Sequence, residues 1–497
     1  MYYCTIKKKA MLQRISVTSL IIGLLIVFSV VSLISLSISP LPWFDEIVFA
    51  NISESFNAGN FLELSAAPPI FNDTRQVYVY GPVFFAVSSI PITLFGLSEI
   101  TFRFLPLFFG LLCIALVQHF FFKKRKIMQL TLALLIISDA IFTSNSHSGR
   151  MDTMAIFFWI TGLLFSMNSF EKDRFNYAPW ITGLCFALGY LTTPRSFMVY
   201  GNFALLYFIG ITIQFGYQKA LINSIKAATA FITPVGLWIF FIFGSLTEYQ
   251  AYYSNLSGTF VGGTPLPPIF QWPLIMIVGL LFLYGVLFKK DKLLGSFKSP
   301  IVPFSIASMI SFYVLVFDTG TYSIFIIFFY YLLLITWSDL LLLKKYRNIL
   351  LLLFIIGNSL ILSIKYTVVF TGERWAKKEQ MNAFIKQHVG PGNLLIGDDV
   401  YYYGCRKNDV EFQFMDYYLT DSIRESLQRE LYNYDYLFVS DRMQKEKPKI
   451  IDVYKKNSVL VPIDTLYFDK SIHLPAPLAS LQNSVYNSYN GVLYKRN

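Results

Sequence analysis

Long apolar runs separated by short polar segments dominate the pattern along this chain. A membrane-spanning helix needs about 17–25 predominantly apolar residues. Runs of about that length lie at 15–38, 104–122, 127–143, 153–170, 178–193, 197–214, 227–244, 273–288, 301–317, 322–343 and 348–370. The pattern therefore predicts a polytopic α-helical membrane protein with about eleven spans.

The composition supports this interpretation. Of the 497 residues, 55% are hydrophobic and only 14% are charged, whereas a soluble globular chain carries about 25% charged residues. The first run is too long for a signal-peptide core and lacks a small-residue cleavage site, so we interpret it as a retained anchor. The basic residues behind the net charge of +11 are scattered in short loops, which does not favour nucleic-acid binding.

The basic clusters predict the orientation, because Lys and Arg are enriched on the cytoplasmic side of membrane proteins. With the N-terminus in the cytoplasm, every cluster falls on that side. The clusters lie at 7–9, 123–126, 172–174, 219–226, 289–292 and 344–347. The loop 39–103 and the tail from Thr371 then lie outside the cytoplasm. We expect a multi-pass protein of the cell inner (plasma) membrane.

The apolar segment 82–96 is an exception to the span count. It is short and contains Pro91, and counting it as a span would place the cluster at 123–126 outside. We therefore predict a re-entrant or surface-lying helix, which contacts membrane lipids within the first outer loop, 39–103.

The tail differs from the rest of the chain. "WAKKEQMNAFIKQHVGPG" has helical spacing with a Gly-Pro-Gly stop, and "NLLIG", "YDYLFVS" and "SVLVP" are typical of short strands. We predict two domains. The first is a transmembrane domain at 1–370, whose first outer loop carries candidate catalytic acids, and the second is a small extracytoplasmic α/β cap domain at 371–497.

Two adjacent acids, Asp45 and Glu46, directly follow the first span in "PLPWFDEIVFANIS". Asp is common at helix starts, where it accepts backbone N–H groups, so a helix cap is one interpretation. The other is a reaction at the membrane interface in which a carboxylate accepts a proton. The local sequence leaves both interpretations open.

Other polar residues of the outer loops are candidates for substrate contacts. Arg103, Arg150 and Arg195 each lie at the outer end of a span. A single such arginine is usually an interfacial anchor, but three of them around an acidic pair favour a cavity that holds an anion. Further candidates in the same loops are Asp152, His147, Tyr78 and Tyr80, although a lone loop histidine is more often merely solvated.

These features in this order resemble the polytopic GT-C glycosyltransferases, and most closely the bacterial relatives of protein O-mannosyltransferases and of the aminoarabinose transferase that modifies lipid A. The matching stretches are "WFDEIVFANI", "YVYGPVFFAVSSIPITLFGLSEITFRFLPLFFGLL", "SNSHSGRMDTMAIFFW" and "GLCFALGYLTTPRSFMVY". The resemblance covers about the first 210 residues, and the later spans and tail match in layout. Each motif alone is unspecific, and the ordered set carries the resemblance.

The resemblance implies an inverting glycosyltransferase of the cell envelope, a hexosyl- or pentosyltransferase. It would move a sugar from a polyprenyl-phosphate carrier to a hydroxyl group of a lipid, glycan or protein acceptor. Asp45 would be the general base and Glu46 its orienting neighbour. The three arginines would bind the donor phosphate, because guanidinium groups suit phosphate oxygens. Asp152 would hold an arginine or the sugar.

The sequence departs from the lipid A branch at one informative place. That branch carries an acid, which is a metal ligand, and then a lysine before the matching proline, whereas Tyr80 and Gly81 precede Pro82 here. This puts that metal and that acceptor in doubt. No Cys or His pattern has zinc-site spacing either. We expect no required cofactor, and the residues give no support for a divalent metal.

The competing interpretation is a transporter or flippase of lipid-linked sugars. Transporters place ionisable residues near the bilayer midplane and often contain repeated halves. The sequence shows no repeat, and Asp139 and His119 are its ionisable residues that lie away from span ends. The glycosyltransferase interpretation therefore fits the residues better.

The predicted topology can be tested by single-cysteine labelling in a background without the four native cysteines. A cysteine at Lys124 should stay unlabelled by an impermeant thiol reagent in intact cells, because positive loops remain in the cytoplasm. A cysteine at Arg75 should be labelled and serves as the control. Labelling of the cysteine at Lys124 from outside would contradict the eleven-span topology.

Overall fold

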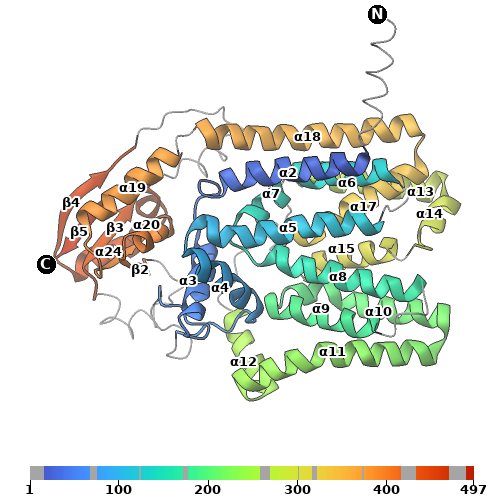
Figure 1. Ribbon diagram of the computed structural model, residues 1–497, viewed down its shortest axis with the longest axis horizontal. Coiled ribbons are helices and arrows are strands. Elements are labelled where there is room, and N and C mark those ends of the chain that lie inside the picture. The colour runs from blue at the N-terminus through green and yellow to red at the C-terminus, as the bar shows by residue number, and fades with distance from the viewer. Residues whose placement is uncertain are drawn as a thin grey trace, which may run out of the picture. The chain divides into compact units, whose positions relative to one another are not determined.

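The computed structural model is mostly helical (Figure 1). It describes residues 16–67, 75–121, 125–171, 177–257, 269–299, 301–315, 322–371, 374–415, 433–468 and 489–497. Three groups of predicted basic residues lie outside these ranges, at 7–9, 123–124 and 172–174.

The chain divides into two compact units. The bundle unit comprises residues 1–32, 106–146 and 151–362. The loop–tail unit comprises residues 33–105, 147–150 and 363–497. The first outer loop and the tail, which are far apart in the sequence, thus belong to the same unit. The predicted functional division at residue 370 remains a prediction.

The bundle unit consists of apolar helices packed around α17 (Ile324–Leu341), which is buried along nearly its whole length. α17 packs against α6 (Lys126–Ser138), α8 (Asp152–Glu171), α13 (Trp272–Phe288) and α15 (Ile301–Leu315). One such contact is an edge-on ring pair between Trp159 and Phe329, with centroids 4.6 Å apart. The remaining helices that lie wholly or partly in this unit are α2 (Val17–Ser35), α5 (Glu99–Phe121), α7 (Ala140–His147), α9 (Ala178–Thr192), α10 (Ser196–Phe215), α11 (Tyr217–Phe243), α12 (Leu246–Ser257), the 3₁₀ turn η1 (Ile269–Gln271), α14 (Lys290–Ser296) and α18 (Lys344–Thr371).

The outer helices expose apolar side chains, as expected for surfaces that face lipid. Leu352, Leu353 and Ile356 on α18, and Phe240 and Phe241 on α11, are all more than half exposed. Exposed apolar surface of this extent is rare in soluble monomers. Among the described residues, five helices are long and apolar enough to cross a membrane, or up to seven if each of two bent helix pairs counts as one span.

Each of the eleven predicted ranges overlaps at least one of these helices. The range 127–143 covers two of them, because the chain bends by 64° between α6 and α7. The reason is Asp139, whose backbone is extended at this point. Its carboxylate accepts the N–H groups of Ile141 and Phe142 at 2.8 and 2.9 Å and so starts a new helix. A short polar side chain that bonds to nearby backbone competes with helix continuation.

The first outer loop contains two helices in the loop–tail unit, α3 (Phe44–Asn57) and α4 (Val83–Phe95). They pack through aromatic rings, with Phe49 against Phe84 and Phe85 at centroid distances of 6.3 Å. The predicted helix at 82–96 is thus present as α4. At about 1.5 Å per residue it is about 20 Å long, too short for a hydrocarbon core of about 30 Å. Its predicted position at the membrane surface remains a prediction.

The described part of the tail forms one five-stranded sheet with flanking helices. The strand order is β2-β1-β3-β5-β4, with β1 parallel to β2 and β3, and β5 antiparallel to β3 and β4. The strands are β1 (Leu394–Gly397), β2 (Glu411–Phe414), β3 (Tyr436–Ser440), β4 (Leu460–Leu466) and β5 (Gly491–Arg496). The helices are α19 (Arg374–His388), α20 (Tyr402–Lys407), α23 (Asp441–Glu446) and α24 (Pro448–Asn457).

Candidate active site

The two adjacent acids lie in the first turn of α3, where the helix dipole favours negative charge. The N-cap residue of this helix is Trp43, so Asp45 does not occupy the N-cap position that the capping interpretation required. Successive residues of an α-helix point about 100° apart. Glu46 therefore faces the interior with Phe49, and Asp45 faces outward with 27% of its side chain exposed.

Glu46 forms a buried, two-pronged ion pair with Arg103 of α5. The Arg103 Nε and Nη2 atoms donate to Oε1 and Oε2 of Glu46 at 2.7 and 3.0 Å, and both side chains are 0% exposed. The remaining Arg103 nitrogen, Nη1, donates to the backbone carbonyl of Leu36 at 2.6 Å. All three nitrogens of this guanidinium thus have partners within the protein.

Two further donors complete the surroundings of Glu46. The backbone N–H of Gly149 bonds to its carboxylate, and the Tyr403 hydroxyl of α20 donates to Oε1 at 3.2 Å. Position 149 must be glycine, because a Cβ there would lie 2.3 Å from the Phe102 ring and 2.8 Å from Cγ of Glu46. Through Tyr403, the tail contributes a side chain that contacts Glu46 directly.

The protein environment shifts the pKa values of both Glu46 and Tyr403. Burial raises the pKa of Glu46, although the neighbouring guanidinium acts in the opposite direction. Burial also raises the pKa of Tyr403 well above its ordinary range, so that the hydroxyl keeps its proton and stays a donor. Glu46 is enclosed and fully hydrogen-bonded, which suits it to holding structure rather than to meeting a substrate.

Asp45 has the opposite surroundings. Its Oδ2 atom lies 3.4 Å from Nη1 of Arg150, whose side chain is 6% exposed. The Arg150 guanidinium also lies over the Trp43 ring, 5.1 Å from its centroid, in a cation–π arrangement. Asp45 and Arg150 therefore form a partly accessible carboxylate–guanidinium pair beside an aromatic surface.

Polar contacts seat the tail on the first outer loop within the same unit. Lys378 pairs with Glu99 at 2.8 Å, and Arg406 pairs with Glu54 at 2.6 Å. The side chain of Asn51, which begins a glycosylation sequon, is buried and donates to the Tyr402 hydroxyl at 3.4 Å. Together these contacts join the tail helices α19 and α20 to the first outer loop.

The structure brings several predicted site residues together. Asp45, Glu46, Arg103 and Arg150 form the cluster described above. His147 is buried at the end of α7, with its Nε2 atom 3.3 Å from the Tyr366 hydroxyl. Tyr80 is also buried and packs edge-on against Phe49 at 5.0 Å, while Tyr78 is partly exposed and burial raises its pKa. The expected contact between Arg103 and phosphate finds no support in this geometry, because Glu46 and Leu36 already take its donors.

Two predicted residues belong to the bundle unit. Asp152 is buried in the first turn of α8. Arg195 precedes α10, hydrogen-bonds to the hydroxyl of Tyr322 and lies over that ring, 4.4 Å from its centroid. Their roles in substrate binding remain predictions. Among the described residues no group of three or more His, Cys, Asp or Glu side chains could hold a metal ion.

Comparisons with known proteins place the fold. Neither family models nor curated protein sequences give a match. ArnT from Cupriavidus metallidurans in the apo state matches with a TM-score of 0.60 at 13% identity, over 96% of this chain and 98% of that one. The chain shares the fold of ArnT. The structure of ArnT bound to undecaprenyl phosphate gives a TM-score of 0.59 at 12% identity, over 96% and 97% of the two chains.

An oligosaccharyltransferase from Archaeoglobus fulgidus in the apo form also matches, with a TM-score of 0.50 at 12% identity, over 87% of this chain and 71% of that one. The likeness to ArnT extends over nearly the full length of both chains. The GT-C fold predicted from the sequence is therefore confirmed.

The buried ion pair predicts a large asymmetry between two acids of α3. Glu46→Gln should lower the free energy of unfolding by about 3–5 kcal/mol, because it leaves the Arg103 charge buried without its counter-charge. Glu54→Gln is the matched control on the same helix. The side chains of Glu54 and its partner Arg406 are 24% and 35% exposed, so the loss of this ion pair should cost about 1 kcal/mol or less. Thermal unfolding in detergent measures both, and equal costs would contradict the assigned structural role of Glu46.

Proposed function

We propose that this protein is an integral-membrane inverting glycosyltransferase that takes a sugar from a polyprenyl-phosphate carrier. Three observations support this proposal. The chain shares the fold of ArnT, which has been seen bound to undecaprenyl phosphate. A partly exposed carboxylate, Asp45, lies next to a guanidinium, Arg150. Both belong to the same unit as the buried pair of Glu46 and Arg103.

Asp45 and Arg150, the pair that carries the proposal, supply the proton acceptor and the cation that the reaction requires. The acceptor hydroxyl oxygen attacks the anomeric carbon from the face opposite the phosphate, and a new C–O bond forms. The bond between that carbon and the phosphate oxygen breaks, and its electron pair leaves with the phosphate. Asp45 accepts the hydroxyl proton as general base. Arg150 stabilises the negative charge on the departing phosphate, for which guanidinium geometry is well suited.

The other residues take supporting roles in this proposal. Glu46 and Arg103 position α3, so Arg103 acts on the phosphate site only indirectly. Arg195 is a further candidate for the phosphate, and Asp152, His147, Tyr78 and Tyr80 are candidates for sugar contacts. A metal or other cofactor plays no part in the step as written.

The finer predictions from the sequence belong to the same proposal. They are eleven spans, a cytoplasmic N-terminus, an extracytoplasmic α/β cap domain at 371–497 and a location in the bacterial inner membrane. The transferred sugar is a hexose or a pentose, and the acceptor is a lipid, a glycan or a protein. Asn51 favours a bacterial setting, because a glycan on this residue, on the same helix as the acidic pair, would block that pair.

One observation favours the alternative of a transporter or flippase of lipid-linked sugars. The helix pair α6–α7 is broken at the buried acid Asp139, and broken helices with ionisable residues are common in transporters. A flippase moves the carrier without breaking the bond between sugar and phosphate. The donor experiment described below therefore separates the two functions.

The catalytic role of Asp45 predicts a large loss of activity in Asp45→Asn. The amide keeps the shape of the side chain but cannot accept the proton, so the transfer rate should fall by about a hundredfold or more. Glu54→Gln changes an acid of similar exposure on the same helix and should keep wild-type activity. Wild-type turnover by a folded Asp45→Asn variant would reject the general-base assignment.

The donor prediction follows from the chemistry of the leaving group. Purified enzyme in detergent should transfer labelled sugar from a polyprenyl-monophosphate carrier and not from matched UDP- or GDP-sugars. Arg150→Lys should weaken donor use by about tenfold or more, because lysine keeps the charge but loses the two-pronged geometry. Efficient transfer from a nucleotide sugar would refute the donor class, and carrier movement without transfer would favour a flippase.

A further inference from the structure

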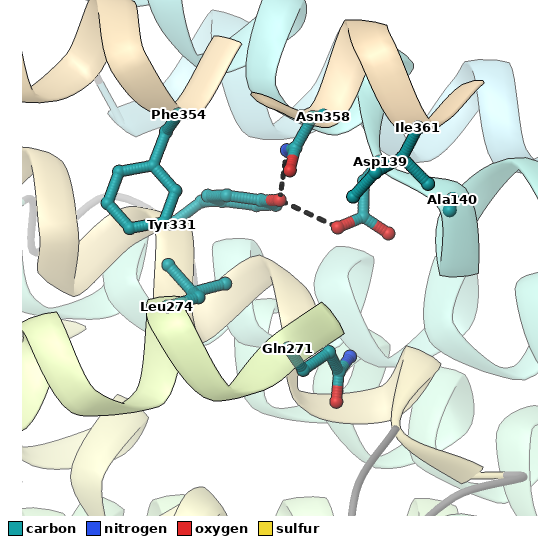
Figure 2. Close-up of a pocket in the computed structure, with 8 residues that line it drawn as sticks. All are labelled: Asp139, Ala140, Gln271, Leu274, Tyr331, Phe354, Asn358 and Ile361. Atoms are coloured by element: carbon teal, nitrogen blue, oxygen red, sulfur yellow. Dashed lines mark hydrogen bonds between the residues drawn. The ribbon is translucent and has the colours of Figure 1, made fainter. Parts of the chain in front are cut away.

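A buried polar cluster surrounds the break between α6 and α7 in the bundle unit. Asp139 sits at the break, Tyr331 comes from the middle of α17, and Asn358 comes from α18. Gln271 ends η1 and precedes α13. Figure 2 shows these four polar side chains around one small cavity. The candidate active site uses none of them.

The hydrogen bonds at the Asp139 side chain all lead to its carboxylate, which accepts them. The Asn358 amide donates to the Tyr331 hydroxyl at 2.8 Å, and that hydroxyl donates to Oδ2 of Asp139 at 2.6 Å. The other oxygen, Oδ1, accepts the N–H groups of Ile141 and Phe142. The carboxylate thus receives three donors, and hydrogen bonds to the charged form favour that form. All three bonds are ones that an ionised carboxylate can accept.

The negative charge has no cationic partner within the described part of the chain, where no Lys or Arg forms an ion pair with Asp139. A buried charge is costly unless it is paired, and intramembrane acids usually pair with a counter-charge. A positive charge next to this carboxylate would therefore stabilise it.

Gln271 supplies a second, independent indication of a ligand. Its side chain is 3% exposed, and neither amide atom has a hydrogen-bond partner among the described residues. A buried polar group without a partner costs about 1–3 kcal/mol. Gln271 lines the same cavity as the carboxylate of Asp139, so a ligand in this cavity would satisfy both.

The cavity limits the size of that ligand. It offers about 10 Å³ to the centre of a water-sized particle, which is room for about one such particle. The lining residues contribute a carboxylate and two side-chain amides, whose oxygens are hard ligands. A single carboxylate matches one positive charge, whereas divalent ions in proteins usually collect several carboxylates and waters.

We propose that this cavity binds one small monovalent cation, with sodium as the probe ion, between Asp139 and Gln271. The cation balances the buried charge and accepts oxygen contacts from both side chains. It also holds the bend between the two helices in place. Broken helices in membrane proteins commonly coordinate sodium in this way, through oxygens at the break. This site is independent of the proposed sugar transfer, and so is its test.

The experiment compares full-length protein in detergent in sodium chloride and in choline chloride at equal ionic strength and pH. A cation that binds only the folded state stabilises it by mass action. We expect sodium to raise the Tm of the wild type by about 2 °C or more. Equilibrium dialysis with radioactive sodium should give close to one bound ion per chain.

Variants assign the effect to the cavity. Asp139→Asn removes the charge and keeps the shape, and Gln271→Leu removes the amide oxygen, so each should abolish the sodium-dependent shift and the bound ion. Asp339→Asn is the control, because this carboxylate of α17 already pairs with Arg125 and Arg347, and it should keep the shift. If one cavity variant fails to fold, the other variant and the dialysis of the wild type still test the proposal.

Three results would overturn the proposal. The first is a wild-type Tm that is equal in sodium and choline, together with no bound sodium. The second is a sodium shift that persists in either cavity variant. The third is a stable Gln271→Leu protein whose Tm is the same in both salts, together with a wild type whose Tm does not depend on sodium. That result would mean that the cavity holds only a water molecule.

Discussion

A carboxylate and a guanidinium can leave water together only if each finds enough hydrogen-bonding partners inside the protein, because the desolvation of each ion costs several kcal/mol. Glu46 and Arg103 meet this condition through two mutual bonds, Leu36, Gly149 and Tyr403. The pair fixes the rotation of α3 about its axis. Asp45, one residue earlier on the same helix, must then face outward beside Arg150. Burial of one acid thus sets the direction of the other.

Local patterns were sufficient to predict most of the helices. Apolar runs predicted eleven spans, and each overlaps a helix, because a run of apolar residues reports the length of a helix directly. In the tail, the Gly-Pro-Gly after residue 389 marked the end of α19, and apolar runs marked β1, β3 and β4. β2 and β5 were missed, since "EFQF" and "GVLYKR" are short segments whose strand character depends on pairing with β1 and β3.

The candidate site could be predicted only in part, because its contacts join residues that are far apart in the sequence. The acidic pair and Arg150 were identified from their order along the chain. Their separate roles could not be predicted in this way, because Arg103 and Tyr403, which contact Glu46, lie 57 and 357 residues from it. Three consecutive tyrosines at 401–403 were the one visible signal for the tail residue. The bend at Asp139 could not be predicted either, because an aspartate inside an apolar run is compatible with both a straight and a broken helix.

The short connection between α18 and α19 has a consequence for how the tail is held. α18 ends at Thr371 and α19 begins at Arg374, so the tail starts within a few residues of a long helix that also belongs to the bundle unit. Because the tail and the first outer loop are parts of one chain, their contacts form intramolecularly, at a higher effective concentration than between separate proteins. A few polar contacts, such as the pair of Lys378 and Glu99, then suffice to seat it. The same contacts between two separate proteins would be too weak to form a lasting complex.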